Sequence, residues 1–260
     1  MPDSDLELLI KAAHKAADIA KPFANGAVRS WEKDDDAGPV TDADLAVNQM
    51  LSSFLRSERP DYGWLSEESE DDIFRLSADR CFVIDPIDGT RSFIKGEDTW
   101  AHSFAITKRG EPVAAVVYLP MLDCLYCAEK GEGATLNAKA ISVSKATSLL
   151  GSNILAARPA QDVRFWKNGI VPKFNRFHRP SLAYRLGLVA EGQYDGMITF
   201  RDSWEWDICA GALITAEAGA IVSDILGNPL TFNQRLPITK GVVSAAPFVH
   251  SDFLDLSDPH

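Results

Sequence analysis

The N-terminal part of the chain carries apolar side chains at helical spacing. From residue 6 to residue 20 they return every three or four positions, which predicts a helix with one buried face. Asp3 or Ser4 can cap the start of this helix. Lys21-Pro22 should interrupt or kink it, because proline removes a backbone donor and clashes with the preceding turn.

A second helix is predicted after a polar loop. The loop runs from residue 32 to residue 39, where Lys33 is followed by a run of three aspartates, Asp34, Asp35 and Asp36. Thr41 or Asp42 can cap the helix that follows. Its buried face is formed by four apolar residues at helical spacing: Val47, Met50, Leu51 and Phe54.

Farther along the chain, short apolar runs predict strands instead of helices. Two such runs cover residues 63–66 and 81–84. Residues 104–106 and 113–119 flank a polar turn and predict an antiparallel hairpin, and 124–128 predicts a third strand beside it. A meander of this kind forms one large antiparallel sheet with helices packed on it.

The second half of the chain alternates strands with helices. Strands are predicted at 153–157, 196–199 and 220–222, and helices at 181–191 and 208–218. This alternation indicates a smaller α/β layer. With a boundary near residues 148–151, we predict an N-terminal α+β subdomain over 1–150 and a C-terminal α/β subdomain over 151–260.

Composition limits the classes of function. The 260 residues are enough for a well-buried core, and no apolar run is long enough to cross a membrane. Residues 1–7 are acidic where a signal peptide would be basic, so a cytoplasmic location is expected. The formal net charge of −11 argues against binding a nucleic-acid polymer.

The cysteines give no clear sign of chemistry. Cys124 and Cys127 have the spacing of a redox or zinc pair, but they lie in a predicted strand, where positions three apart point to opposite faces. Cys81 and Cys209 fall inside apolar segments. We therefore expect four reduced, structural thiols.

Two carboxylates follow the predicted strand at 81–84 directly. Between Asp85 and Asp88 stands Pro86, which fixes φ, and Gly89 then permits a tight turn, so both acids can point into one space. Two anions this close repel each other unless a cation lies between them. All-oxygen ligands favour Mg²⁺, Mn²⁺ or Ca²⁺ over zinc. We interpret the segment as a metal site, with a plain surface turn as the alternative.

Two further acidic segments favour the metal site. Glu67 and Glu68 follow the predicted strand at 63–66. Asp207 stands immediately before a helix of small residues that ends at Gly219. If several carboxylates hold metal ions, the acidity of the chain is compatible with an anionic substrate, because the ions present positive charge to it.

Together these segments resemble the inositol monophosphatase superfamily. Its members are Mg²⁺-dependent, lithium-sensitive phosphatases that act on inositol phosphates, 3'-phosphonucleotides, histidinol phosphate or fructose bisphosphate. The resemblance spans nearly the whole chain, and its segments are Val40-Thr41-Asp42, Ser66-Glu67-Glu68-Ser69, Asp85 through Thr90, and Trp206-Asp207. It implies a mixed α/β fold, a five-layer αβαβα sandwich with the active site in the cleft between the two halves.

The resemblance also implies the metal shell. Glu67, Asp85 and the backbone carbonyl of Ile87 would hold one Mg²⁺ ion. Asp85, Asp88 and Asp207 would hold a second, about 3.5–4 Å from the first, with Asp85 bridging. The adjacent Glu68 would either point away or hold a third ion, and Mn²⁺ should be able to replace Mg²⁺.

Catalytic and substrate-binding roles follow from the same resemblance. Asp42 would accept a hydrogen bond from the Thr90 hydroxyl, so that Thr90 orients the attacking water, and Glu67 would take part in catalysis. Both Thr90 and Asp42 could instead be simple helix caps. The amides of Gly89 and Thr90 would bind phosphate oxygens, with Asp88 and Asp207 against the substrate.

The loop before the second helix receives two interpretations. In the family this loop folds over the site and its lysine helps to organise it, which would give Lys33 a role. The run from Asp34 to Asp36 is expected to be solvated.

The substrate is the least determined part of the prediction. Phe93-Ile94-Lys95, residues 188–192 and Glu205-Trp206-Asp207 resemble the bacterial 3'-phosphoadenosine phosphatases. We therefore favour a 3'(2'),5'-bisphosphate nucleotidase that converts 3'-phosphoadenosine 5'-phosphate to AMP and phosphate. Arg185 could contact the second phosphate, or could be an ordinary surface arginine of its helix.

Other functions remain open. An inositol-1-monophosphatase would need an acid before the Trp-Asp pair, and Asp202 is the residue that could serve. The segment from Asp85 to Phe93 also resembles histidinol-phosphate phosphatases. A non-catalytic regulatory binding protein is the alternative from another class. In every enzymatic case the partner is a small phosphorylated metabolite rather than a nucleic acid or a membrane, and a homodimer would be usual for the family.

Overall fold

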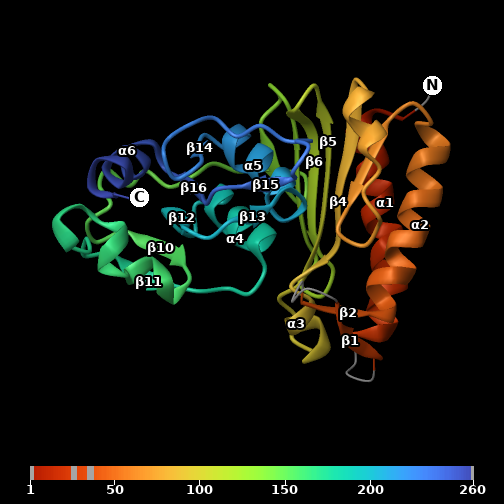
Figure 1. Cartoon of the computed structure of the whole chain (residues 1–260), viewed down its shortest axis with the longest axis horizontal. Coiled ribbons are helices and arrows are strands. Elements are labelled where there is room, and N and C mark those ends of the chain that lie inside the picture. The colour runs from red at the N-terminus through yellow and green to blue at the C-terminus, as the bar shows by residue number, and fades with distance from the viewer. Residues whose placement is uncertain (1–2, 25–27, 34–37, 259–260) are drawn as a thin grey trace.

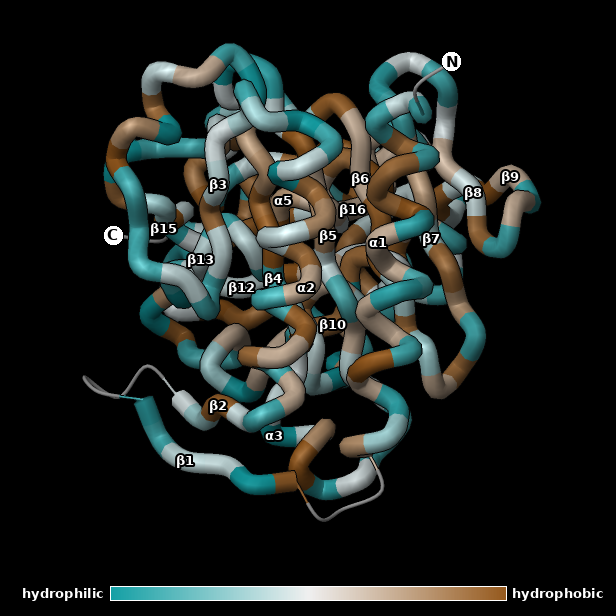
Figure 2. Tube along the Cα trace, turned by 90° about the vertical axis from the view of Figure 1, so that its right-hand side faces the viewer, coloured by the Kyte–Doolittle hydropathy of each residue, from teal (hydrophilic) through white to brown (hydrophobic). Residues whose placement is uncertain are grey.

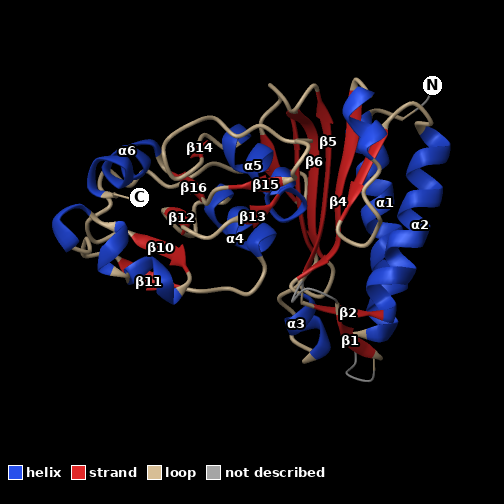
Figure 3. Ribbon diagram, in the orientation of Figure 1, coloured by secondary structure: helices blue, strands red, loops and turns tan. Residues whose placement is uncertain are grey.

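Three layers of helices alternate with two β-sheets along the long axis of the molecule (Figure 1). The computed structural model describes residues 3–24, 28–33 and 38–258. Figure 3 shows helices on both faces of each sheet. The helices are α1 (Asp5–Ala20), α2 (Asp42–Glu58), α3 (Thr90–Ile94), α4 (Leu182–Ala190), α5 (Glu205–Glu217) and α6 (Pro247–Leu256). The predicted αβαβα sandwich is confirmed.

The outer layer of α1 and α2 forms as the sequence pattern predicts. Ser4 caps α1 and forms a capping box with Glu7, and Thr41 caps α2 in the same way with Asp44. At Lys21-Pro22 the chain passes from α1 into one turn of 3₁₀ helix, so the predicted interruption is confirmed. The apolar faces of both helices pack on the larger sheet.

The larger sheet consists of seven strands in the order in which they follow along the chain. They are β3 (Gly63–Ser66), β4 (Arg80–Asp88), β5 (Ala101–Lys108), β6 (Glu111–Leu119), β7 (Cys124–Glu129), β8 (Ala134–Leu136) and β9 (Lys139–Ala140). The predicted antiparallel meander is confirmed from β4 to β9. The exception is β3, which is parallel to β4 and places Ser66 beside Ile84. Because the two strands are parallel, the acids that follow both of them emerge at one edge of the sheet.

The smaller sheet has five strands in the order β11, β10, β12, β16 and β14. Their bounds are Asn175–Phe177, Asn153–Ala156, Gly196–Thr199, Val242–Ala245 and Ile221–Ser223. The predicted strands and helices of this half are present, although α5 begins earlier than its apolar run suggested. The larger sheet thus uses residues 63–140 and the smaller sheet residues 153–245, while α4 and α5 lie between the two sheets (Figure 1).

Two small two-stranded units complete the fold. One pairs β13 (Ser203–Trp204) with β15 (Ile238–Thr239), directly before α5. The other is the hairpin of β1 (Ser30–Glu32) and β2 (Pro39–Thr41). This hairpin lies beside α3 at one end of the molecule, where β4 ends (Figures 1 and 2).

The core is divided among three apolar clusters that fill the spaces between layers. One lies between α1, α2 and the larger sheet, one between that sheet and α4 with α5, and one between the smaller sheet and α6. Figure 2 shows the hydrophobic segments gathered in the middle of the molecule. All four cysteines are free thiols, as expected. Among the described residues, no helix has both the length and the apolarity to cross a membrane.

Candidate functional site

Three carboxylates from distant parts of the chain meet at the end of the larger sheet. One oxygen from each of Glu67, Asp85 and Asp207 lies within 4.8 Å of the other two. Glu67 and Asp85 follow the parallel strand segments of β3 and β4, and Asp207 lies in the first turn of α5. The start of α5 is fixed to the sheet because the Ser103 hydroxyl donates to the Trp206 carbonyl at 3.0 Å. The structure thus assembles three of the predicted metal ligands.

The loop that carries Asp85 departs from regular strand geometry. The pairing of β4 with β5 shifts register between Asp85 and Asp88, and the amide of Ile87 donates to Asp85 Oδ1 at 3.0 Å. Gly89 then takes a φ of 96°. A Cβ there would lie 3.4 Å from the Thr99 carbonyl oxygen, so both the backbone conformation and the space favour glycine.

Asp88 connects this loop to the second half of the chain. Its Oδ2 accepts hydrogen bonds from the Ser181 hydroxyl and the Ala183 amide, both at 2.6 Å, at the start of α4. It is not part of the group of three carboxylates, but it lines the same cleft as Glu67 and Asp207. One of its oxygens is therefore already used for a contact within the protein.

Burial and mutual repulsion make this cluster unfavourable without a cation. Burial, followed by the charges of Glu67, Asp88 and Asp207, raises the pKa of Asp85 well above its usual range. The pKa of Asp207 is raised in the same way, by burial and then by the neighbouring acids. Burial raises the pKa of Asp88 to about 6, although its hydrogen bonds oppose this. An all-oxygen set of buried, mutually repelling carboxylates fits a hard divalent cation such as Mg²⁺.

Lys33 supplies a positive charge to this cluster. Its Nζ contacts Glu67 Oε1 at 2.8 Å and Glu68 Oε1 at 2.6 Å. Burial lowers the pKa of Lys33, but the two glutamates raise it by a larger amount. The pKa of Lys33 therefore lies above its usual value. Burial and the Glu67 charge raise the pKa of Glu68 to about 7. Lys33 thus lies in the site, whereas the run from Asp34 to Asp36 falls outside the described residues.

The expected pairing of Thr90 with Asp42 is not what the structure forms. The Thr90 hydroxyl donates to the Ile87 carbonyl at 3.2 Å, and Asp42 is a half-buried residue whose amide donates to the Arg29 carbonyl. The predicted hydrogen bond between Thr90 and Asp42 is therefore corrected. The physical reason is that Asp42 is the first residue of α2, and from this position its side chain does not follow the buried stripe of the helix.

Asp44, which the sequence prediction missed, is the buried acid of this helix. Its Oδ2 accepts hydrogen bonds from the Thr41 amide and hydroxyl, and its Oδ1 is buried without a partner in the described part of the chain. Burial raises its pKa to about 6, and the charge of Glu67 acts in the same direction. The signal was available, because Asp44 lies three residues before Val47 on the apolar stripe of α2.

Asn48 is a second missed residue, one helical turn beyond Asp44. Its Nδ2 donates to the Glu68 carbonyl and to Ser69 Oγ, each at 3.0 Å, and its Oδ1 accepts from the Ser66 hydroxyl at 2.8 Å. These bonds hold the turn that presents Glu67. Asp44 and Asn48 are polar residues four positions apart on the buried face of α2, and this sequence pattern could have identified them.

Beside the acids, the same cleft has a basic wall. The cleft measures about 530 Å³, and Arg91, Lys95, His178, Arg185 and Arg201 line it together with Thr90 and Gly89. Burial lowers the pKa of His178, and the charges of the surrounding arginines lower it further. The cations of this wall are thus close enough to act on one another.

Arg185 is the most buried cation of the wall. Its side chain is held by the carbonyls of Arg179 and Pro180 and by His178 Nε2, and the residue is only 4% exposed. It forms no ion pair with any described residue. Burial lowers its pKa to about 10, with Asp88 opposing and Arg201 adding to the effect. The alternative of an ordinary surface arginine is therefore wrong.

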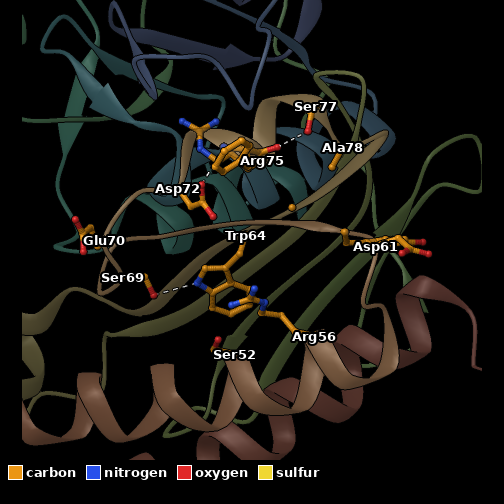
Figure 4. Close-up of a pocket in the computed structure, with 13 residues that line it drawn as sticks. Ser52, Arg56, Asp61, Trp64, Ser69, Glu70, Asp72, Arg75, Ser77 and Ala78 are labelled. Atoms are coloured by element: carbon orange, nitrogen blue, oxygen red, sulfur yellow. Dashed lines mark hydrogen bonds between the residues drawn. The ribbon is translucent and has the colours of Figure 1, made fainter.

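A second cavity of about 470 Å³ lies between α2 and the 3₁₀ turn Ile73–Ser77 (Figure 4). In this cavity the Trp64 indole donates to the Ser69 hydroxyl at 3.0 Å, and Arg75 pairs with Asp71. Of the predicted site residues, none is among the described residues that line it. The Trp64 indole and the Arg75 guanidinium are thus already used in contacts within the protein.

Comparison with known proteins shows which family the sequence resembles. The model of the inositol monophosphatase family matches residues 2–254. The chain is 34% identical to the Nus factor SuhB of Escherichia coli strain K12, over 94% of this chain and 92% of that protein. It is 32% identical to an inositol-1-monophosphatase of Mesorhizobium japonicum, over 85% of this chain and 86% of that protein.

A solved structure agrees with the sequence comparisons. The IMPase of Thermotoga maritima superimposes with a TM-score of 0.81 at 27% identity, covering 96% of this chain and 95% of that one. Fold, sequence and the cluster of acids at the end of the sheet thus lead to one conclusion: the chain belongs to the inositol monophosphatase family.

Proposed function

We propose that this protein is a metal-dependent phosphomonoesterase that hydrolyses a small phosphate ester with an activated water. The observation that carries the proposal is a single cleft that is lined by both carboxylates and cations. The carboxylates suit divalent ions, and the cations suit the charge of a phosphate. A metal-dependent phosphatase would use both kinds of charge in one site.

The carboxylates are the proposed ligands of the cofactor. Glu67, Asp85 and Asp207 would hold Mg²⁺ together with Asp88 and the Ile87 carbonyl, and Mn²⁺ would substitute. Two or three ions are part of the proposal, with Glu68 beside the third. When bound, such ions lower the pKa of a coordinated water and stabilise charge on the phosphate oxygens.

The protein's own groups would orient the water and the ester. Thr90 lies at the cleft with its hydroxyl on the Ile87 carbonyl, and the amides of Gly89 and Thr90 begin α3, where they would bind phosphate oxygens. We propose Asp44 instead of Asp42 as the acid that works with Thr90. Its Oδ1 is buried without a described partner, and α2 follows directly from β2, which packs against α3. Catalysis would then consist mainly of positioning and electrostatic stabilisation.

The basic wall supports a substrate with two phosphate groups. Arg185 and Arg201 line the cleft together with Asp88, and two guanidinium groups would suit two phosphate groups. Neutral groups hold the Arg185 guanidinium, and although the charge of Asp88 acts on it, it forms no ion pair with a described residue and would be available to a second anion. This favours a 3'(2'),5'-bisphosphate nucleotidase, with 3'-phosphoadenosine 5'-phosphate as the substrate. Inositol 1-phosphate and histidinol phosphate are the alternatives.

A phosphate-release assay with a panel of esters tests the proposal. The purified protein with Mg²⁺ should hydrolyse 3'-phosphoadenosine 5'-phosphate more efficiently than inositol 1-phosphate, histidinol phosphate or fructose 1,6-bisphosphate. Mn²⁺ should support turnover, and Ca²⁺ and Li⁺ should inhibit it. Ca²⁺ inhibits because it accepts a looser geometry at longer distances. Full activity in excess chelator would exclude the metal mechanism, and a preference for inositol 1-phosphate would exclude the nucleotidase.

A regulatory binding protein is the second candidate. It is favoured by the relatives at 34% identity that carry the name Nus factor. The two candidates differ in one measurement. A purified protein that binds Mg²⁺ but releases no phosphate from any ester of the panel would support the regulatory role, whereas turnover that disappears in Asp85→Asn would support the enzyme.

A further inference from the structure

His102 is a buried histidine directly behind the loop that carries Asp85 and Asp88. It lies on β5, is fully buried, and packs between Trp100 and Phe104, with ring centroids 5.4 Å and 5.7 Å from its own. Its Nδ1 contacts the Pro86 carbonyl. Because a carbonyl can only accept, Nδ1 carries the proton and donates it. Burial lowers the pKa of His102 to about 4, so the ring is neutral in the working range of pH.

This hydrogen bond reaches the metal site through one peptide group. The carbonyl of Pro86 and the amide N–H of Ile87 belong to the same planar unit. At its other end that N–H donates to Asp85 Oδ1 at 3.0 Å. A donor on the carbonyl polarises the amide and strengthens the bond made by its N–H. His102, the peptide and Asp85 therefore form a chain of two hydrogen bonds that ends on the carboxylate.

The irregular pairing of β4 with β5 explains why a side chain, and not a neighbouring strand, contacts the Pro86 carbonyl. The register between β4 and β5 shifts from Asp85 to Asp88, and the ladder pairs neither Pro86 nor Ile87 with β5. The peptide between them thus lacks the strand contacts that hold its neighbours. The other ring nitrogen of His102, Nε2, is buried without a partner in the described part of the chain. Among the described residues, the ring therefore makes its polar contact through Nδ1, with the Pro86 carbonyl.

We propose that His102 is a positioning residue, which fixes the Pro86–Ile87 peptide and through it the orientation of the Asp85 carboxylate toward the metal. This inference rests on the proposed metal-dependent function. It concerns a residue that never touches the metal or the substrate. Partners of this kind around metal ligands typically change metal affinity or activity by about 10–100-fold when they are removed.

Two substitutions separate positioning from packing. His102→Phe keeps the aromatic ring between Trp100 and Phe104 but removes the donor. His102→Asn removes the ring but keeps an N–H at the same number of bonds from the backbone as Nδ1. Mn²⁺ affinity, measured by electron paramagnetic resonance without substrate, should fall about tenfold or more in the Phe variant and stay within about threefold of the unmodified protein in the Asn variant. Melting temperatures should rank the other way, with Asn the less stable.

A second buried histidine provides the matched control. His250 on α6 is also buried, but its Nε2 pairs with the Ser223 hydroxyl at 2.7 Å, in the other half of the chain. His250→Phe should leave Mn²⁺ affinity unchanged whatever happens to stability. Unchanged affinity in His102→Phe, or losses in both His102 variants that follow their melting temperatures, would overturn the inference. An unmodified protein that binds no Mn²⁺ would overturn the proposed function itself, and the inference with it.

Discussion

The acidic and the basic sides of the cleft are built in different ways. The acids converge from the ends of β3 and β4 and the start of α5, and Lys33 is the cation that contacts two of them. On the basic side, Arg185 is fixed by backbone carbonyls and a neutral ring, which orient it but carry no full negative charge. Each side therefore keeps an excess of one charge. We therefore expect the acidic side to bind cations and the basic side to bind anions.

The largest effect is expected when a carboxylate on the acidic side is neutralised. Asp85→Asn should lower turnover by about three orders of magnitude or more, because several kcal/mol of charge stabilisation depend on the metal that it holds. The change also removes repulsion, so the melting temperature without metal should stay level or rise. Steady-state kinetics and thermal unfolding in chelator measure both effects. Near-normal turnover, or an unfolded variant, would contradict the proposed role of Asp85.

The next largest loss of kcat is expected when Asp44 is changed, whereas a change of Asp42 should have little effect. Asp44→Asn should lower kcat by about 100-fold, within the usual range for loss of an acid–base group. Asp42→Asn is the matched control on the same turn of α2 and should stay within about threefold. If the two variants ranked in the reverse order, the original assignment of Asp42 would be restored. Stability must be measured in parallel, since Asp44 also bonds to the residue that caps α2.

A smaller effect is expected on the basic side. Arg185→Ala should lower kcat/KM for 3'-phosphoadenosine 5'-phosphate by about 10–100-fold, because a charge-assisted hydrogen bond contributes about 1.5–3 kcal/mol. A monophosphate should hardly be affected. Arg164→Ala, an exposed arginine that pairs with Asp162 in the same half of the chain, is the control and should change neither rate. Equal losses on both substrates would mean that Arg185 acts through the fold.

The smallest effect is a dependence of stability on pH. The folded protein holds the pKa of Asp85 and Asp207 above their usual range and raises that of Asp88 to about 6, so it binds more protons than the unfolded chain. Without metal, the free energy of unfolding should therefore fall by about 1–3 kcal/mol as pH rises from about 4, the usual pKa of an aspartate, to about 6, where Asp88 titrates in the folded protein. Denaturant titrations at several pH values measure this slope. Saturating Mg²⁺ should flatten it, and a rising slope in chelator would refute the charge balance described for the acidic side.

The acidic side was predictable from the sequence, and most of the basic side was not. Glu67, Asp85 and Asp88 each follow an apolar strand or lie at its end, so periodicity places each of them at the end of a strand, and the family resemblance groups them into one site. The burial of Arg185 depends on how residues 178–180 fold back on α4, and no spacing in the sequence encodes that.

Asp42 and Asp44 show a second limit of prediction from the sequence. Asp42 fits an N-cap in the sequence, and only the phase of α2 against the sheet distinguishes this half-buried acid from the buried Asp44. The parallel direction of β3 was also out of reach, since a strand's own residues do not fix its orientation to a partner. The layered fold itself followed from the family resemblance rather than from periodicity.

The contact of Asp88 with the start of α4 has a consequence for how this protein folds. Its partner Ser181 is 93 residues away along the chain, and Ala183 is 95 away. Contacts of such long sequence separation form late, because a large loop must close before they contribute. A nascent chain that ends before α4 can form the larger sheet but lacks Asp207 and the partners of Asp88. If these carboxylates hold the metal, its binding requires a chain that has folded through α5, and we expect its appearance in a refolding experiment to time the packing of α4 and α5 on the larger sheet.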